Sequence, residues 1–345
     1  MASMAAAVWY GPGRENFRLE ELERPEPGPN EVVMRVRACY FGAMHVRAVL
    51  RGHPELRPPE VFGRMVAGDV AAVGANVDGI QEGMRITVNP EAPCGRCFYC
   101  ANFEPVHCLN LKTLRPGGLA EYVCLSSELV PGIFELPANV GYAEGAYTET
   151  LACVIQGILK SETTIGDRVV ILGCGGVGLT FVQLAKLRGA TKIIVADLFD
   201  ASLESAHTLG ATRTVNVERE TLADVVREET AGYGADVVIE AVGSGPTYQQ
   251  AFELLRRGGT MVGFGGSPPG TTFTADPNLI HYRSVNARGS YHYAPDLFRR
   301  ALDLIASGQI DLDPIITHHL PLARVTSDSV DLYQTPDCKT LVIDI

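Results

Sequence analysis

Four short apolar runs in the middle of the chain are separated by segments with helical periodicity. The runs are RVVILG (168–173), TKIIVAD (191–197), ADVVIEAVG (235–243) and GTMVGFGG (259–266). Strands buried on both faces of a sheet are continuously apolar, and helical segments between them are typical of βαβ units. The alternation predicts an α/β fold with a doubly wound parallel sheet over residues 154–290.

A glycine-rich segment directly follows the first of these runs and opens a helical pattern. It reads Gly173-Cys174-Gly175-Gly176-Val177-Gly178 and fits G-x-G-x-x-G. In this context the first glycine permits a tight turn, the second lets backbone N–H groups approach a pyrophosphate, and the third allows close packing of helix on strand. The helix N-terminus also favours an anion. The segment predicts a dinucleotide-binding loop with five cofactor-binding residues: Gly173, Gly175, Gly176, Val177 and Gly178.

Asp197 ends the next predicted strand, about 20 residues further on, where a carboxylate hydrogen-bonds the adenosine ribose. Its charge would repel a 2′-phosphate, so the sequence predicts NAD(H) rather than NADP(H). Val242, Phe264 and Gly265 follow later strands, at the ends where the cofactor is expected to lie. The alternative is a glycine turn without a ligand and a solvated Asp197.

The flanking parts of the chain have a different texture. Residues before 154 are rich in Gly, Pro and short β-like runs such as EVVMRVR (31–37) and VAGDVAAV (66–73), and the chain ends on LVIDI. This pattern predicts a β-rich domain, barrel-like or partly open, made of residues 1–153 and 291–345. The doubly wound domain, residues 154–290, is then inserted into it.

Four cysteines near residue 100 have the spacing C-x2-C-x2-C-x7-C. They are Cys94, Cys97, Cys100 and Cys108. Four thiolates suit tetrahedral zinc and leave no open coordination position, so a metal bound here would be structural. Free or buried thiols are the alternative, but three cysteines within seven residues do not resemble core packing. The spacing predicts one structural zinc in a lobe of about residues 93–110.

The overall charge and cysteine count limit the partners and the compartment. The net charge of −11 argues against a nucleic-acid-binding face or a basic face for acidic membranes. No apolar run approaches the length of about twenty residues that crosses a membrane. Nine cysteines, an odd number and mostly scattered, fit a reducing compartment. We expect a cytoplasmic protein with a small-molecule substrate and no nucleic-acid or membrane partner.

Several of these segments together resemble the zinc-containing medium-chain alcohol and polyol dehydrogenases. They are YGPGRENFRLEELERPEPGPNEVVMRVRA (10–38), the cysteine lobe, GGLAEYV (117–123) and GDRVVILGCGGVGL (166–179). The likeness covers essentially the whole chain. It implies an N-terminal catalytic domain with a GroES-like β fold, a Rossmann domain, a cleft between them, and homodimers or homotetramers.

The chain departs from this family where a second, catalytic zinc is usually bound. The family uses a cysteine, a histidine and a glutamate or cysteine, and this chain has Phe41, Arg64 and Glu149 at those positions. Because neither Phe41 nor Arg64 can bind zinc, the resemblance implies a member without a catalytic zinc. Cys39, two residues before Phe41, is the alternative as a shifted ligand.

Without a metal, other groups must polarise the substrate oxygen and move the proton. A guanidinium at Arg64 keeps its charge and can donate to a developing oxyanion, and we expect it to pair with Glu149. His45, near a family histidine, is the first candidate for proton transfer, followed by Tyr40 and Glu149. The alternatives are a packing histidine and a salt bridge without a catalytic role.

Three functions fit these predictions. The first is an NAD(H)-dependent oxidoreductase that interconverts a secondary alcohol, of polyol, cyclitol or sugar type, and a ketone. The second keeps the cofactor and reduces an activated C=C bond, with Arg64 as the donor to an enolate. The third is a non-enzymatic nucleotide-binding protein. The polyol preference comes from the family resemblance alone.

Overall fold

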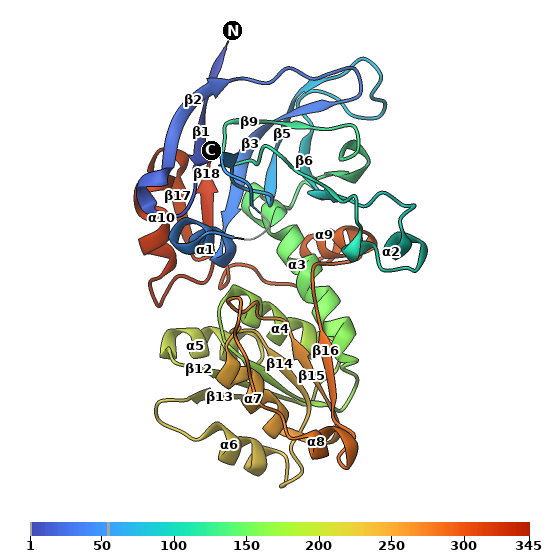
Figure 1. The fold of residues 1–345 in the computed structure, drawn as a ribbon, viewed down its shortest axis with the longest axis vertical. Coiled ribbons are helices and arrows are strands. Elements are labelled where there is room, and N and C mark those ends of the chain that lie inside the picture. Colours follow the sequence, from blue (N-terminus) through green and yellow to red (C-terminus); the bar gives the residue numbers. More distant parts are fainter. Residues whose placement is uncertain (1, 54–55) are drawn as a thin grey trace. The chain divides into compact units, whose positions relative to one another are not determined.

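The computed structural model describes residues 2–53 and 56–345. The chain forms two compact units, the first made of Met1–Thr150 and Ala294–Ile345 and the second of Leu151–Tyr293 (Figure 1). These boundaries lie three residues from the expected ones at 153/154 and 290/291. The long helix α3 (Tyr142–Ser161) contains the first boundary. No helix in the described ranges is both long enough and apolar enough to cross a membrane.

The second unit contains a parallel sheet of six strands in the order β13-β12-β11-β14-β15-β16. The strands are β11 (Arg168–Leu172), β12 (Lys192–Asp197), β13 (Arg213–Asn216), β14 (Ala235–Glu240), β15 (Leu255–Gly263) and β16 (Asn286–Gly289). The four runs that predicted the sheet form its centre, and the strand order reverses between β11 and β14. The predicted doubly wound parallel sheet is confirmed.

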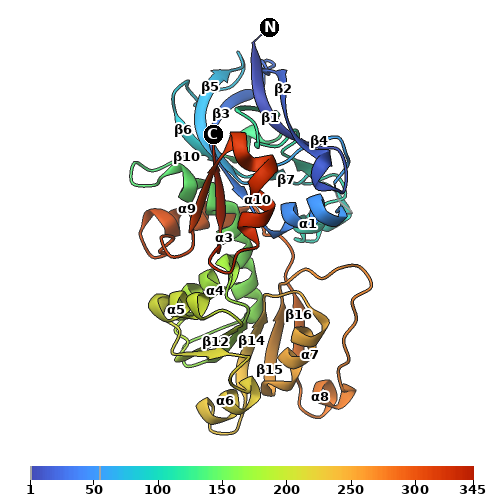
Figure 2. The same cartoon turned by 90° about the vertical axis from the view of Figure 1, so that its left-hand side faces the viewer.

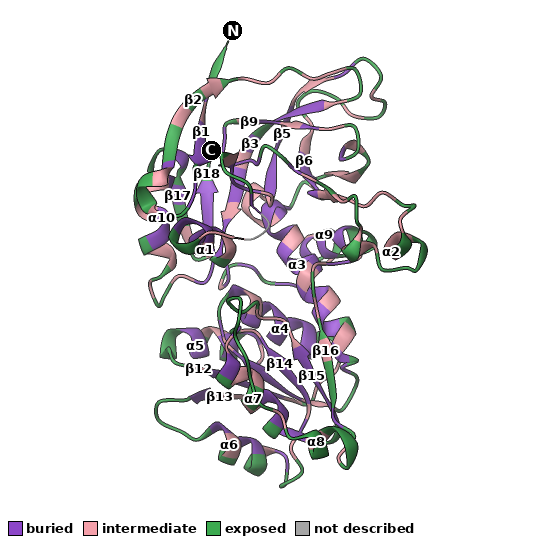
Figure 3. Cartoon of the chain, viewed as in Figure 1, coloured by how far each residue is buried: buried purple, intermediate pink, exposed green. Residues whose placement is uncertain are grey.

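Five helices accompany this sheet. They are α4 (Gly176–Leu187), α5 (Asp200–Leu209), α6 (Leu222–Glu229), α7 (Gly245–Glu253) and α8 (Pro277–His281). Helix α4 contacts β11 and β12, α5 contacts β12 and β13, and α7 contacts β14 and β15. Figure 3 shows that the central strands are buried while α6 and α8 present exposed faces. Burial on both faces explains why the strands are continuously apolar.

The first unit is built mainly from antiparallel strands. A sheet of three strands has the order β2-β1-β4, and a sheet of seven has the order β10-β6-β5-β3-β18-β17, with β9 also paired to β3. The strands are β1 (Ser3–Trp9), β2 (Phe17–Glu23), β3 (Val32–Phe41), β4 (Glu60–Val61), β5 (Val66–Val73), β6 (Arg85–Val88), β9 (Tyr122–Leu125), β10 (Ile133–Glu135), β17 (His318–Pro321) and β18 (Leu341–Asp344). The C-terminal strand β18 pairs antiparallel with β3, so segments from the N-terminal and C-terminal parts of the sequence share one sheet (Figure 2).

Short elements complete the first unit. A small hairpin pairs β7 (Glu91–Ala92) with β8 (Lys112–Thr113), and the helices besides α3 are α1 (Ala43–Arg51), α2 (Phe98–Ala101), α9 (Asp296–Ala306) and α10 (Val325–Tyr333). The buried core includes an aromatic group in which Phe17 and Phe41 stack with ring centroids 6.3 Å apart, and Trp9 stacks on Phe62 at 5.4 Å. This aromatic group lies where β3 leads into α1.

Candidate functional site

The glycine loop connects β11 to α4 and has the geometry that dinucleotide binding needs. Gly173 has φ +96°, a conformation that side chains rarely adopt, and a Cβ on Gly178 would lie 2.0 Å from the carbonyl oxygen of Gly173. Both positions therefore require glycine. A Cβ on Gly175, the N-cap of α4, would have no atom within 4 Å, so one side of the loop is open. A pyrophosphate can approach the backbone N–H groups there.

Asp197 lies beside this loop at the carboxyl end of β12. Its Oδ2 accepts a hydrogen bond from the backbone N–H of Cys174 (2.7 Å), and its Oδ1 accepts from the N–H groups of Leu198 (2.7 Å) and Phe199 (3.0 Å). These bonds fix a carboxylate next to the glycine loop, where the ribose of an adenosine would lie. The structure brings Asp197 and the loop together.

The loops after β14 and β15 lie at the same edge of the sheet. A Cβ on Gly173 would lie 2.9 Å from Cγ2 of Val242, whose side chain is 52% exposed. The N–H groups of Phe264 and Gly265 donate to the carbonyl oxygen of Glu240 at 3.0 and 2.9 Å. The predicted cofactor residues thus gather along the carboxyl edge of the parallel sheet, with the glycine loop at the point where the strand order reverses.

The four predicted zinc ligands converge in the lobe that contains α2. The sulfur atoms of Cys94, Cys97, Cys100 and Cys108 lie within 4.8 Å of one another. Sγ of Cys97 is 3.6 Å from Sγ of Cys100 and 3.9 Å from Sγ of Cys108. A tetrahedron with Zn–S bonds of about 2.3 Å has sulfur–sulfur distances of about 3.8 Å. The donor set fits a closed zinc site.

Backbone N–H groups around the lobe assist ionisation of some of these thiols. The N–H of Arg96 lowers the pKa of Cys94 to about 6, and the N–H of Cys100 lowers the pKa of Cys97. Burial raises the pKa of Cys100 to about 12. Because adjacent thiolates repel one another, only a bound cation allows all four thiols to ionise together.

His45 is part of the core and not of an accessible site. Its side chain is fully buried and stacks on Phe41, with ring centroids 5.1 Å apart, while the ring of Phe62 is tilted against it at 5.4 Å. Its Nδ1 accepts a hydrogen bond from the N–H of Gly42 (3.1 Å) and so caps α1. Burial, followed by the charge of Arg64, lowers the pKa of His45 to about 3. The imidazole is neutral near pH 7 as expected, but it is fully buried, which disfavours it for proton transfer.

Tyr40 and Glu149 lie close to each other in the first unit. Tyr40 is half-buried, and its ring meets Tyr147 edge-on at 6.1 Å. A Cβ on Gly42 would lie 2.4 Å from the ring of Tyr40, so the ring lies directly over the start of α1. Burial raises the pKa of Tyr40 well above its usual value, Tyr333 and Tyr147 raise it further, and the charge of Glu149 makes the smallest contribution. The Tyr40 hydroxyl therefore stays protonated.

The residues around Arg64 do not fit a second zinc site. The Phe41 side chain lies in the aromatic core, and burial raises the pKa of the Cys39 thiol, which disfavours the thiolate that zinc needs. Glu149 is the single zinc donor among the three family positions. In the described ranges, the cysteine lobe is the only group of three or more close metal-binding side chains.

Arg64 itself is half-buried and follows a constrained turn. Gly63 has φ +97°, and a Cβ there would lie 2.5 Å from Sγ of Cys39 and 2.7 Å from the N atom of Leu119. The turn therefore holds Arg64 near His45, whose pKa its charge lowers. The expected pairing of Arg64 with Glu149 stays a prediction.

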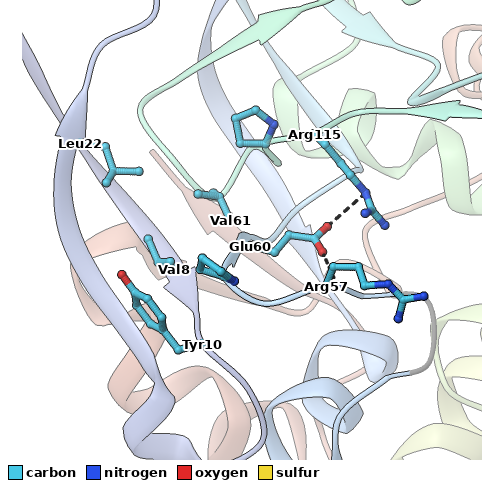
Figure 4. Close-up of a pocket in the computed structure, with 9 residues that line it drawn as sticks. Val8, Tyr10, Leu22, Arg57, Glu60, Val61 and Arg115 are labelled. Atoms are coloured by element: carbon cyan, nitrogen blue, oxygen red, sulfur yellow. Dashed lines mark hydrogen bonds and ion pairs between the residues drawn. The ribbon is translucent and has the colours of Figure 1, made fainter.

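A separate pocket of about 440 Å³ lies on the first unit, next to Glu60 and Val61 of β4 (Figure 4). Nε of Arg115 is 3.4 Å from Oε1 of Glu60, and the N–H of Arg57 donates to the other carboxylate oxygen at 3.1 Å. None of the predicted site residues lines this pocket. Sequence reasoning missed it, because its wall combines residues that are far apart in the chain.

Comparisons with known proteins agree with the fold and the resemblance. The family model "Alcohol dehydrogenase GroES-like domain" matches residues 28–137, and "Zinc-binding dehydrogenase" matches residues 176–307. Sorbitol dehydrogenase of Gallus gallus is 30% identical over 318 residues, covering 90% of this chain and 88% of its own length. Erythritol/L-threitol dehydrogenase of Mycolicibacterium smegmatis is 29% identical over 347 residues, covering 93% and 92%.

A solved structure matches the whole chain. It is a Sinorhizobium meliloti protein described as a zinc-binding dehydrogenase bound to NADP, with a TM-score of 0.93, 32% identity and coverage of 100% of both chains. The GroES-like and Rossmann fold class, the family resemblance and the assignment as an enzyme are confirmed. The non-enzymatic alternative is therefore set aside. The chain belongs to the zinc-type medium-chain dehydrogenase/reductase family of oxidoreductases.

Proposed function

We propose that the protein is an NAD(H)-dependent oxidoreductase that interconverts a secondary alcohol of polyol, cyclitol or sugar type and the corresponding ketone. The names of the erythritol/L-threitol and sorbitol dehydrogenases support the substrate class. The placement of Asp197 is the observation that carries the cofactor assignment. Its carboxylate is fixed beside the glycine loop by the N–H of Cys174. The same charge disfavours the 2′-phosphate of NADP(H), although a structural relative is bound to NADP.

The residues of the second unit fit the dinucleotide. The open side of Gly175 and the N-terminus of α4 would bind the pyrophosphate, and Asp197 would bind the adenosine ribose. Val242, Phe264 and Gly265 would border the nicotinamide half. The bound dinucleotide supplies the hydride acceptor or donor, and the chain supplies its orientation.

In the first unit, Arg64 would hold the substrate oxygen. A guanidinium remains charged at every working pH and stabilises negative charge that develops on that oxygen. Glu149 and Tyr40 would handle the proton, because Glu149 is close enough to raise the pKa of the Tyr40 hydroxyl. Tyr40 would donate the proton to the oxygen during ketone reduction and take it back during alcohol oxidation, and Glu149 would exchange that proton with Tyr40. His45 has no part in this proposal, because it is buried and caps α1.

We also propose that the chain holds one zinc, which has a structural role. Cys94, Cys97, Cys100 and Cys108 would bind it in a closed site that leaves no position for substrate. The residues at Phe41, Arg64 and Glu149 provide a single zinc donor between them. The reaction therefore does not depend on a second zinc.

Assays with two substrate classes test the reaction type. NADH oxidation is measured with a panel of ketoses and cyclitol ketones and with a panel of enones. We expect turnover with the ketones and recovery of the secondary alcohol as the product. Arg64 could also donate to an enolate. Turnover restricted to enones, with the C=C bond reduced, would therefore contradict ketone reduction and support the second function, reduction of an activated C=C bond.

The assembly and location complete the proposal. We propose a cytoplasmic homodimer or homotetramer that binds neither nucleic acid nor membranes, in line with the net charge of −11 and the nine cysteines. Light scattering on the purified protein should give two or four times the chain mass of 37.1 kDa. A monomer at micromolar concentration would contradict this assembly.

A further inference from the structure

Glu240 is a buried acidic residue that the sequence analysis did not single out. It is the last residue of β14, and its side chain has no solvent exposure. Buried carboxylates are uncommon because desolvation is costly, so the contacts of this one require an explanation.

The side chain of Glu240 fixes the loop that follows its own strand. Its Oε1 accepts hydrogen bonds from the backbone N–H groups of Val242 (3.0 Å) and Gly243 (2.8 Å) and from Oγ1 of Thr247 (2.7 Å). Hydrogen bonds to a charged acceptor are stronger than those to a neutral one, and here three donors share one carboxylate oxygen. The loop between β14 and α7 is held from its beginning to its end.

The backbone of Glu240 fixes the neighbouring loop as well. Its carbonyl oxygen accepts from the N–H groups of Phe264 and Gly265, directly after β15. A Cβ on Gly265 would lie 2.3 Å from the N atom of Gly243 and 2.8 Å from Oε2 of Glu240. The two loops therefore pack backbone to backbone above the carboxylate.

The second carboxylate oxygen is not satisfied. Oε2 is inaccessible to solvent and has no hydrogen-bond partner among the described residues. A buried oxygen without a donor destabilises a protein. An apolar side chain at this position would not carry that penalty. This cost points to a role in the arrangement of the two loops.

The sheet order places these loops in one half of the cofactor site. Asp197 and the adenosine side lie toward β12 and β13, on one side of β11, whereas β14 and β15 lie on the other side. A dinucleotide crosses such a sheet where the strand order reverses, so its nicotinamide half lies over β14 and β15. We infer that Glu240 is a positioning residue that holds both loops around the nicotinamide half of the cofactor. The inference rests on the proposed NAD(H)-dependent function.

Two ligands separate this role from general stabilisation of the fold. ADP contains only the adenosine half of the cofactor, whereas NADH contains both halves. Binding of each ligand is measured by titration calorimetry with the full-length wild type, Glu240→Ala and Glu240→Gln. Glu253→Gln, an exposed glutamate on the helix that follows the same loop, is the matched control.

We expect Glu240→Ala to weaken NADH binding at least about tenfold, which corresponds to about 1.4 kcal/mol. ADP binding should change less than about twofold. The NADH affinity of Glu240→Gln should lie between those of Glu240→Ala and the wild type, because the amide oxygen of glutamine can still accept hydrogen bonds. The enhancement of NADH fluorescence on binding should also decrease in Glu240→Ala, since the ring is held less firmly.

The outcomes are distinguishable. Equal loss of ADP and NADH binding, or unchanged NADH binding, would overturn the inference. If the Glu240 variants do not fold, Thr247→Val removes one of the three donors and should weaken NADH binding by a few-fold without affecting ADP. Unchanged NADH binding in Thr247→Val would then count against the inference. A wild-type protein that binds neither ligand would instead contradict the proposed function.

Discussion

The cysteine lobe and the region around Arg64 belong to the same structural unit but have opposite chemistry. In the lobe, four sulfur atoms lie within 4.8 Å of one another. Around Arg64, a phenyl ring, a guanidinium and a buried imidazole lie where the family's second metal site is expected. A closed metal site contributes folding free energy, so each ligand is part of the fold. A site that polarises an oxygen needs only a fixed positive charge, which arginine can supply.

Replacement of one lobe cysteine should have the largest effect. Cys97→Ser should abolish zinc binding and unfold the lobe, because structural zinc in small domains contributes about 10–16 kcal/mol of apparent binding free energy. Zinc content by elemental analysis and proteolytic cleavage within residues 93–110 measure the effect. Cys338→Ser, a cysteine outside the lobe, is the control and should retain zinc. A fully folded Cys97→Ser lobe without zinc would show that the metal is not structural.

Removal of the charge at Arg64 should be the next largest effect. Arg64→Met should lower kcat about 10²- to 10³-fold, the usual consequence of losing one donor to a developing oxyanion. Arg64→Lys should recover part of this loss because it keeps the charge, and Arg51→Met, an exposed position on α1, should have no effect. Steady-state kinetics with a ketone substrate measure the loss. An Arg64→Met enzyme with wild-type kcat would remove Arg64 from the mechanism.

Burial of His45 should make stability depend on pH. The folded pKa of about 3 lies below the unfolded value of about 6.5, so the unfolded chain binds the extra proton between these values. This contribution is fully present above about pH 6.5 and is lost as the pH falls toward 3, by about 3 kcal/mol at pH 4.5. Denaturant unfolding at pH 7 and pH 4.5 measures it.

The variant His45→Phe isolates this contribution. It cannot titrate, so its free energy of unfolding should fall less than that of the wild type between pH 7 and pH 4.5. It should be less stable at pH 7, because it loses the cap on α1, which is typically worth about 1 kcal/mol. His319→Phe, an exposed histidine beside Asp344, is the control. Identical losses in wild type and His45→Phe would show that His45 is not buried in its neutral form.

Cofactor preference is the smallest of these effects. We expect NADH to bind at least about tenfold more tightly than NADPH, or about 1.4 kcal/mol. Asp197→Ala should narrow the difference because it removes the charge that faces the 2′-phosphate, whereas Asp224→Ala, on the exposed face of α6, should not. Fluorescence titration with both reduced cofactors gives the ratio, and equal or tighter NADPH binding by the wild type would contradict the assignment.

The backbone-determined parts of the molecule could be predicted from the sequence. The run VAGDVAAV coincides with β5, and the run RVVILG contains β11. Burial on one or both faces of a sheet determines which positions of a strand are apolar, so the pattern predicts the strand. The requirement for glycine at Gly173 and Gly178 follows from the tight turn and the close packing that the motif demands. These features depend on local geometry.

Side-chain environments were harder to predict. The sequence leaves His45 open between proton transfer and packing. Helix α1 turns positions 45, 48 and 49 inward together, and this helical spacing with Ala48 and Val49 is the signal that favours packing. Glu240 was overlooked although it is a charged residue at the end of an apolar strand. The pairing of Arg64 with Glu149 stays a prediction, because it depends on side-chain packing between distant segments.

The zinc content of the active enzyme tests the central claim most directly. Purified wild-type protein is analysed for metal, and turnover is measured before and after mild chelation that leaves the lobe intact. The account predicts one zinc per chain, bound by Cys94, Cys97, Cys100 and Cys108, and unchanged turnover after chelation. Two zincs per chain, or turnover that is lost on chelation and restored by added zinc, would contradict it and show that the region around Arg64 binds a metal after all.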